Sequence, residues 1–210
     1  MDISRKERDD LRRQREIMEA ALSIFAAQGF HGTTMAQISE SAQYPLGTIY
    51  KYFSSKKQIY HELVLERVHQ LGDILYEISI KPDLSPTEKL KQFLFAKSKF
   101  YRTNNEFIRI YISERSTIDS VLLPKLNQKV NRMNDKMVSL FQKTFEQGQN
   151  GEFKSYPPRE MALLFKDIAH SVSWSSLFED EDEETHHKRL ELIFNIFLNG
   201  VADNKSLQEN

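Results

Sequence analysis

At 210 residues the chain can bury one large core or two smaller ones, and its 40% hydrophobic content is that of an ordinary globular protein. The 29 basic residues nearly balance the 30 acidic residues, so any surface that attracts a polyanion must be local. The lack of cysteine excludes disulfides, thiolate metal ligands and cysteine nucleophiles, and only 7 glycines and 6 prolines argue against a turn-rich all-β fold.

The N-terminal segment 5–15 is dense in charge of both signs. It is either the solvated start of a helix or a basic arm that touches phosphate. The chain start has no apolar stretch typical of a secretory signal, and no uncharged apolar run approaches the roughly 20 residues of a membrane span. We therefore expect a soluble, cytoplasmic protein.

An amphipathic helix follows, in which apolar residues recur at spacings of three and four. Its apolar stripe comprises Ile17, Ala20, Ala21, Ile24 and Phe25. The tripeptide Gln28-Gly29-Phe30 is expected to end this helix, because Gly29 suits a left-handed C-terminal cap.

The stretch 34–57, TMAQISESAQYPLGTIYKYFSSKK, predicts short helices separated by a tight break. Thr33 or Thr34 can cap the first of them, because a side-chain oxygen there accepts from the free amides of the first turn. Pro45 cannot lie inside a helix without losing a hydrogen bond, so the next helix covers about 46–53. Two helices joined by a turn of three or four residues are typical of a helix-turn-helix unit.

Every later segment also has the apolar spacing of a helix. Ser54 or Ser55 can cap the next helix, and Ser85-Pro86 opens another with proline at its first position. The last two long helices are expected at about 158–178 and 184–199.

These patterns predict an all-α fold of about nine helices. We expect a helix-turn-helix DNA-binding domain over residues 1–56 and a larger helical domain for ligand binding and dimerisation over residues 57–210.

A helix-turn-helix inserts its second helix into the major groove and holds phosphates from residues at the helix starts. Residues 43–57 suit this role because they include three lysines and no acid. Ile49 and Phe53 lie four residues apart and are expected in the core, whereas the hydroxyl, phenol and ammonium groups around them can reach DNA. The residues expected to contact DNA are Thr34, Leu46, Gly47, Thr48, Tyr50, Lys51, Tyr52 and Lys56.

Residues 17–65 resemble the DNA-binding domain of the tetracycline-repressor (TetR-like) family of bacterial transcriptional regulators. The matching residues are Ile17-x-x-Ala20-Ala21-x-x-x-Phe25, Gly29-Phe30, Thr33-Thr34-Met35-x-x-Ile38, Gly47-Thr48-Ile49-Tyr50-x-Tyr52-Phe53 and Ser55-Lys56. The resemblance implies a homodimer on a palindromic operator, with a C-terminal domain that binds a small molecule and thereby weakens DNA binding. Two departures bear on the operator sequence. Gln43 stands where the family often has glycine, and Tyr44-Pro45 replaces a small, polar lead into the recognition helix.

Aromatic residues of the middle helices are either ordinary core or the lining of an apolar ligand pocket. Lys97 lies on an apolar side of its helix, where its charge either selects an oppositely charged ligand or extends to solvent. The pocket candidates are Phe93, Lys97, Tyr101, Phe107, Tyr111, Met133, Met137, Phe141 and Trp174.

The last two helices are implied by the resemblance to pair with their copies in a four-helix dimer bundle; the alternative is an intramolecular core. The residues expected at that interface are Phe165, Ile168, Val172, Phe194 and Phe197.

No set of residues predicts catalysis, a metal site or a cofactor site. His186 and His187 adjoin acids, but adjacent residues on a helix point apart, and acids at a helix start are explained by the macrodipole. The favoured function is therefore a homodimeric repressor that binds operator DNA and is released by a small, largely apolar ligand. The alternative is a ligand-independent DNA-binding protein, or an activator, with a filled C-terminal core.

Overall fold

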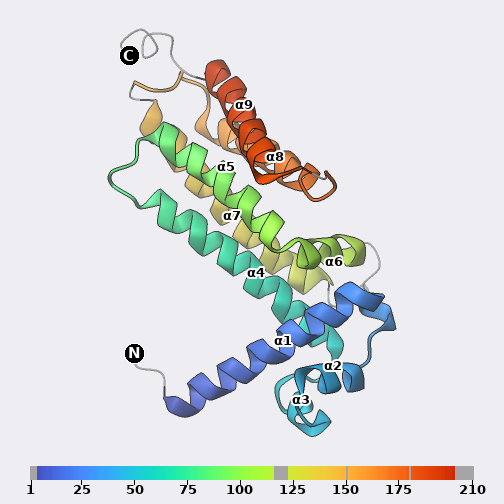
Figure 1. Ribbon diagram of the computed structural model, residues 1–210. Helices are drawn as coiled ribbons and strands as arrows, with labels where there is room; N and C mark the ends of the chain where they lie inside the picture. The colour runs from blue at the N-terminus through green and yellow to red at the C-terminus, as the bar shows by residue number, and fades with distance from the viewer. Residues whose placement is uncertain (1–3, 116–122, 150, 180, 202–210) are drawn as a thin grey trace. The chain divides into compact units, whose positions relative to one another are not determined.

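The computed structural model describes residues 4–115, 123–149, 151–179 and 181–201. These residues form nine α-helices and no strand, which confirms the all-α prediction (Figure 1). The helices are α1 Arg5–Gly32, α2 Met35–Ala42, α3 Leu46–Tyr52, α4 Lys56–Ser79, α5 Pro86–Thr103, α6 Asn105–Arg115, α7 Leu123–Gly148, α8 Pro158–Ser175 and α9 Glu183–Val201. Within the same ranges, no helix is long and apolar enough to cross a bilayer.

The chain packs as two compact units. Unit 1 combines Met1–Val68 with Asn105–Lys129, and unit 2 combines His69–Asn104 with Val130–Asn210. Unit 1 therefore takes in the first half of α4 and all of α6, and it extends beyond the expected boundary at residue 56. The functional division at residue 56 stays a prediction, because compact packing and function need not share a boundary.

Helix starts follow the capping signals of the sequence. Thr34 caps α2, and Ser85 caps α5 with Pro86 in the first turn, as expected. Both caps are reciprocal, since the third helical residue returns a side-chain hydrogen bond to the backbone of the cap. The Ser55 hydroxyl accepts the amide of Gln58 at 3.2 Å and so caps α4.

Two backbone positions differ from simple expectation. Gly29 does not end α1 in a left-handed cap; it has φ 77° and ψ 159° and interrupts a helix that continues to Gly32. Gln43 ends α2 in the left-handed region at φ 56° and ψ 34°. A residue with a Cβ is strained there by about 1–2 kcal/mol.

In the core of unit 1, aromatic rings connect α1 with α4. One of these rings follows directly after the kink at Gly29. Phe30 lies 5.3 Å from Phe25 and 5.5 Å from Tyr60 between ring centroids. All three rings are buried, as are Ile49 and Phe53, which confirms the expectation that these last two face inward.

The core of unit 2 is a connected group of phenylalanines. Phe141 contacts Phe93 and Phe165, each at 5.1 Å between centroids, and Phe165 contacts Phe197 at 5.5 Å. Offset and edge-on pairs of this kind stabilise a core beyond their buried area. The aromatic residues of the C-terminal helices therefore fill the interior of their own unit.

This packing supports the alternative of an intramolecular core for the residues expected at the dimer interface, and the interface itself stays a prediction. Four of the five expected residues, Phe165, Val172, Phe194 and Phe197, are 1–8% exposed in a single chain. They belong to the core of unit 2, and Ile168 packs partly against it. These side chains are therefore already covered within one chain.

Candidate nucleic-acid interface

The turn between α2 and α3 is held by hydrogen bonds that its own residues provide. The Tyr44 amide donates to the Ser39 carbonyl at 3.2 Å, and the Ser39 hydroxyl donates to the Tyr44 carbonyl at 2.6 Å. The Thr48 amide donates to the Pro45 carbonyl at 2.7 Å. Pro45 adds a fixed φ, so the start of α3 is rigidly placed relative to α2.

Helix α3 buries one face and exposes another. Ile49 is fully buried, whereas Leu46 is 40% and Tyr50 is 50% exposed. Gly47 and Lys51 are also exposed, and Thr48 is half-buried. Six of the eight residues expected to contact DNA thus lie on this one short helix and are at least partly accessible, next to a turn that fixes its direction.

Thr34 is exposed at the N-terminus of α2, but its polar groups already have partners. Its hydroxyl accepts the Gln37 amide at 3.3 Å, and its own amide donates to the Gln37 carboxamide oxygen at 2.8 Å. A phosphate bound to the Thr34 amide would replace Gln37, so this contact stays a prediction.

Tyr52 points back to α1. Its phenol donates to a carboxylate oxygen of Asp10, and the Lys51 ammonium lies 3.7 Å from the same oxygen. The hydrogen bond from Tyr52, and then the charge of Lys51, lower the pKa of Asp10. Tyr52 therefore connects α3 to α1, and Lys51, 60% exposed in its side chain, keeps the freedom to turn toward a phosphate.

Lys56 is the clearest departure from the expected DNA contacts. Its ammonium donates to the carbonyls of Phe30, His31 and Thr33 at 2.8, 3.0 and 2.6 Å. An ammonium has three N–H donors, so all of them are used. The charge also lies 4.8 Å from the centroid of the Phe30 ring. Lys56 thus stabilises the connection between α1 and α2, and its expected phosphate contact stays a prediction that would require it to give up one of these bonds.

Unit 1 also holds a feature that sequence patterns did not predict. An open groove of about 940 Å³ lies between α1 and the end of α2, and Arg8, Arg12 and Arg15 line it. Arg12 is paired with Glu16 at 3.0 Å, and the Tyr44 phenol donates to the other oxygen of that carboxylate. The Tyr44 hydrogen bond is the main cause of the lowered pKa of Glu16. The charged start of α1 is helical, and some of its charged side chains are paired within unit 1.

The nine pocket candidates do not gather in one unit. Phe107 and Tyr111 stack on each other in unit 1 at 6.1 Å, whereas the other seven belong to unit 2. Phe93 and Phe141 are buried against each other in the phenylalanine core. Lys97 is buried on α5, Tyr101 and Trp174 are half-buried on α5 and α8, and Met133 and Met137 are half-buried on α7.

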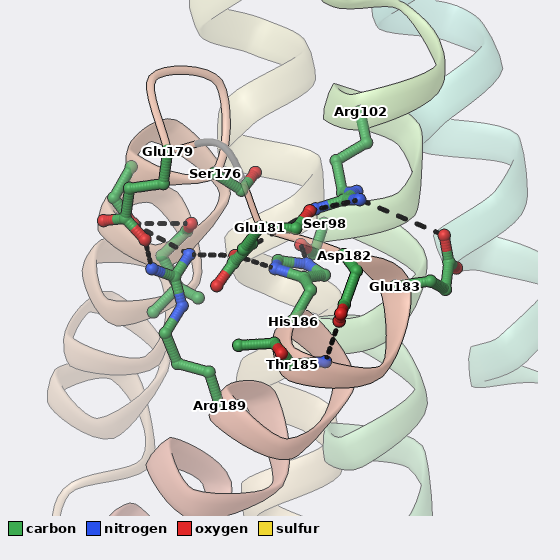
Figure 2. A network of polar contacts seen from close by, with 12 residues as sticks. Ser98, Arg102, Ser176, Glu179, Glu181, Asp182, Glu183, Thr185, His186 and Arg189 are labelled. Carbon is green, nitrogen blue, oxygen red and sulfur yellow. Dashed lines mark hydrogen bonds and ion pairs between the residues drawn. The ribbon is translucent and has the colours of Figure 1, made fainter.

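A polar network in unit 2 was also missed (Figure 2). His186 Nδ1 lies 2.6 Å from a Glu181 oxygen, and His186 Nε2 lies 2.7 Å from the Ser98 hydroxyl. The guanidinium of Arg189 pairs with the same Glu181 oxygen at 2.9 Å. Ser98 is fully buried, and its contact with His186 connects α5 to α9.

His187 points away from this network and pairs with Glu191 at 3.6 Å, as expected for adjacent helical residues. Over the described ranges, no group of three or more histidine or acidic residues is arranged to hold a metal ion.

A short, outward-facing helix behind a rigid turn has the geometry of a helix-turn-helix DNA-binding unit. Residues 17–63 match the sequence profile described as "Bacterial regulatory proteins, tetR family". Residues 17–63 therefore carry the DNA-binding domain of this family, and the match supports a DNA-binding transcriptional regulator of the tetR type.

Similar proteins agree with this assignment. The HTH-type transcriptional regulator YhgD of Bacillus subtilis (strain 168) is 28% identical over 186 residues, which cover 86% of this chain and 93% of that protein. The HTH-type transcriptional repressor AcnR of Corynebacterium diphtheriae is 25% identical over 131 residues, 59% of this chain and 69% of its own. A solved TetR/AcrR-family regulator from Thermobifida fusca YX-ER1 has the same fold, with a TM-score of 0.72 at 19% identity over 90% of this chain and 97% of its own.

Proposed function

We propose that the protein is a homodimeric cytoplasmic repressor that binds a palindromic operator and is released by a small, largely apolar ligand. The observation that carries the DNA side is the outward face of α3, where Leu46, Gly47, Tyr50 and Lys51 are exposed behind the rigid turn. A helix with this exposure can enter a major groove without unfolding any part of unit 1.

A second copy is needed because two half-sites one helical turn (~34 Å) apart require two linked recognition helices. The surface that we assign to the second copy lies on α8 and α9. Leu164 is 49%, Leu192 is 60% and Ile196 is 65% exposed, and the last two lie one helical turn apart. Large apolar side chains grouped on the surface are typical of protein interfaces.

The ligand-independent alternative draws support from the packing of unit 2. Phe93, Phe141 and Phe165 are fully buried and Phe141 contacts both of the others, so these rings stabilise a filled core. If the regulator does respond to a ligand, the ligand binds nearer the surface or displaces this core.

The experiment that tests the proposal is selection of DNA from a random pool by the purified protein, followed by binding measurements on the selected sequence. We expect a palindrome bound by two copies. Failure to bind any duplex at low ionic strength would overturn the DNA side.

A thermal-shift screen then separates the ligand-released repressor from the ligand-independent alternative. A ligand that binds the folded state stabilises it by RT ln(1 + [L]/Kd) and so raises the melting temperature.

A further inference from the structure

Lys97 occupies an unusual place for a lysine. Along α5 its neighbours at three and four residues are Phe93, Leu94, Phe100 and Tyr101, and the first three are core residues. Lys97 itself is only 7% exposed. A charged group at such a place costs folding free energy, because burial removes the water that stabilises its charge.

No described group forms a close ionic contact with this ammonium. Within the described part of the chain, Lys97 has neither a hydrogen-bond acceptor nor an ion-pair partner, and its Nζ lies 5.9 Å from the centroid of the Tyr101 ring. The carboxylate that acts on it electrostatically is Asp167, and Asp167 is paired with Lys166 at 3.0 Å. Burial, reinforced by the charge of Lys166, lowers the pKa of Lys97 to about 8. At neutral pH the group is therefore largely a cation without a counter-ion.

A row of rings leads from Lys97 to the surface. The Tyr101 hydroxyl lies 3.3 Å from His170 Nδ1. His170 lies 5.9 Å from Trp174, and Trp174 lies 5.7 Å from Phe178, between ring centroids. Phe178 is 59% exposed, so the row ends in solvent. The rings provide an apolar wall on which a bound molecule can pack.

We propose that Lys97 anchors a site for a small organic carboxylate whose apolar body packs along the rings of Tyr101, Trp174 and Phe178. This inference rests on the proposed ligand-released function and specifies the chemical class of the ligand. A single ammonium matches a monoanion, whereas a phosphate group normally recruits several cations or backbone amides. The ring row calls for an apolar body, so a bare inorganic anion does not fit.

The protein contains a built-in reporter for this site, because Trp174 is its only tryptophan. The experiment titrates the full chain with 4-phenylbutyrate and with the uncharged 4-phenylbutyramide and follows tryptophan fluorescence. We expect a saturable change with the acid and at least about tenfold weaker binding of the amide, the usual effect of losing one charge-assisted hydrogen bond.

Lys97→Met keeps the length of the side chain and removes its charge. It should weaken phenylbutyrate binding at least about tenfold and leave the weak binding of the amide unchanged. The matched control is Lys99→Met, which removes the same charge from an exposed position on the same helix. Thermal melts confirm that each variant is folded, and Lys97→Arg, which restores the charge, should recover part of the affinity.

Equal binding of acid and amide, unchanged binding by Lys97→Met, or no binding of the acid at millimolar concentration would overturn the carboxylate site. Operator release is measured in parallel to keep the two proposals apart. Release by an uncharged compound alone would support the ligand-released function and refute this site. Carboxylate binding that needs Lys97 but leaves operator affinity unchanged would support the site and refute ligand release.

Discussion

At the residue scale, the two lysines nearest the recognition helix have different roles despite similar positions in the sequence. Lys56 gives all three of its donors to backbone carbonyls, whereas Lys51 is 60% exposed and has one carboxylate at 3.7 Å. Only the second is free to neutralise DNA phosphate.

Removing the Lys51 ammonium by Lys51→Met should weaken binding to all sequences and reduce the salt slope of the binding constant by about one. Lys56→Met should leave that slope unchanged and lower the free energy of unfolding by about 2 kcal/mol, because three carbonyls lose a charged donor. Titrations at several salt concentrations and a denaturant melt measure the two effects. A smaller salt slope in Lys56→Met would show that Lys56 does reach DNA.

Lys97 should also make stability depend on pH. Its pKa is lowered from the ordinary 10.5 to about 8 in the folded chain. Between these values the unfolded chain holds a proton that the folded chain has released, so the free energy of unfolding rises with pH. From about pH 8 to about pH 9.5 this contribution should reach roughly 2 kcal/mol.

Comparison with Lys97→Met isolates this effect from other titrations. The charged groups that act on Lys97 are Lys166 and Asp167. The Tyr101 ring lies next to its ammonium, and the Tyr101 hydroxyl in turn contacts His170. Denaturant melts from about pH 7 to about pH 9.5 should show a smaller rise in the variant than in the parent. Parallel curves would mean that Lys97 titrates normally in the folded chain.

At the element scale, the turn between α2 and α3 carries strain that the fold tolerates. Gln43 is the one non-glycine residue with positive φ in the described ranges, and its amide still donates to the carbonyls of Glu40 and Ser39. Its side chain is exposed, so the residue can be changed without disturbing the core.

Gln43→Gly should raise the free energy of unfolding by up to about 1 kcal/mol, since relief of left-handed strain exceeds the added entropy of the unfolded chain. Ser41→Gly, in the last turn of α2, is the control and should lower stability by a similar amount. Thermal melts of both variants check the opposite signs. A destabilised Gln43→Gly variant would mean that the Gln43 side chain makes a stabilising contact.

At the scale of the whole molecule, unit 2 buries one side of α8 and α9 and leaves another uncovered. Phe165 and Phe197 face the core, while Leu192 and Ile196 are exposed. The proposed dimer therefore depends on the outer residues, and the inner ones stabilise each copy.

Ile196→Glu should convert the dimer to a monomer, because it places a charge where apolar area would be buried. The neighbouring exposed residue supplies the control, Asn195→Glu, which should affect assembly less. Sedimentation velocity over a range of concentrations measures both. If Ile196→Glu sediments as the parent does, the second copy binds elsewhere.

Sequence patterns alone predicted the helices, the caps at Thr34 and Ser85 and the break at Pro45, because these signals act within one or two helical turns. The inward positions of Ile49 and Phe53 followed from their spacing for the same reason. Partners distant in the sequence could not be read in this way. Tyr52 is 42 residues from Asp10, and Lys56 is 23–26 residues from its three carbonyls.

Only the tertiary structure determined which polar groups have partners within the chain and which aromatic rings are buried there. The helical stripes of α8 and α9 show apolar residues but not whether another copy or the same chain covers them. The core phenylalanines of these two helices, Phe165, Phe194 and Phe197, are covered within the chain. Charge has the same ambiguity, since Lys56 has three acceptors whereas Lys97 has none among the described residues, and the sequence does not distinguish them. Helix propensity depends on neighbours along the chain, whereas the desolvation and pairing of a charged group depend on which distant residues the tertiary fold places beside it.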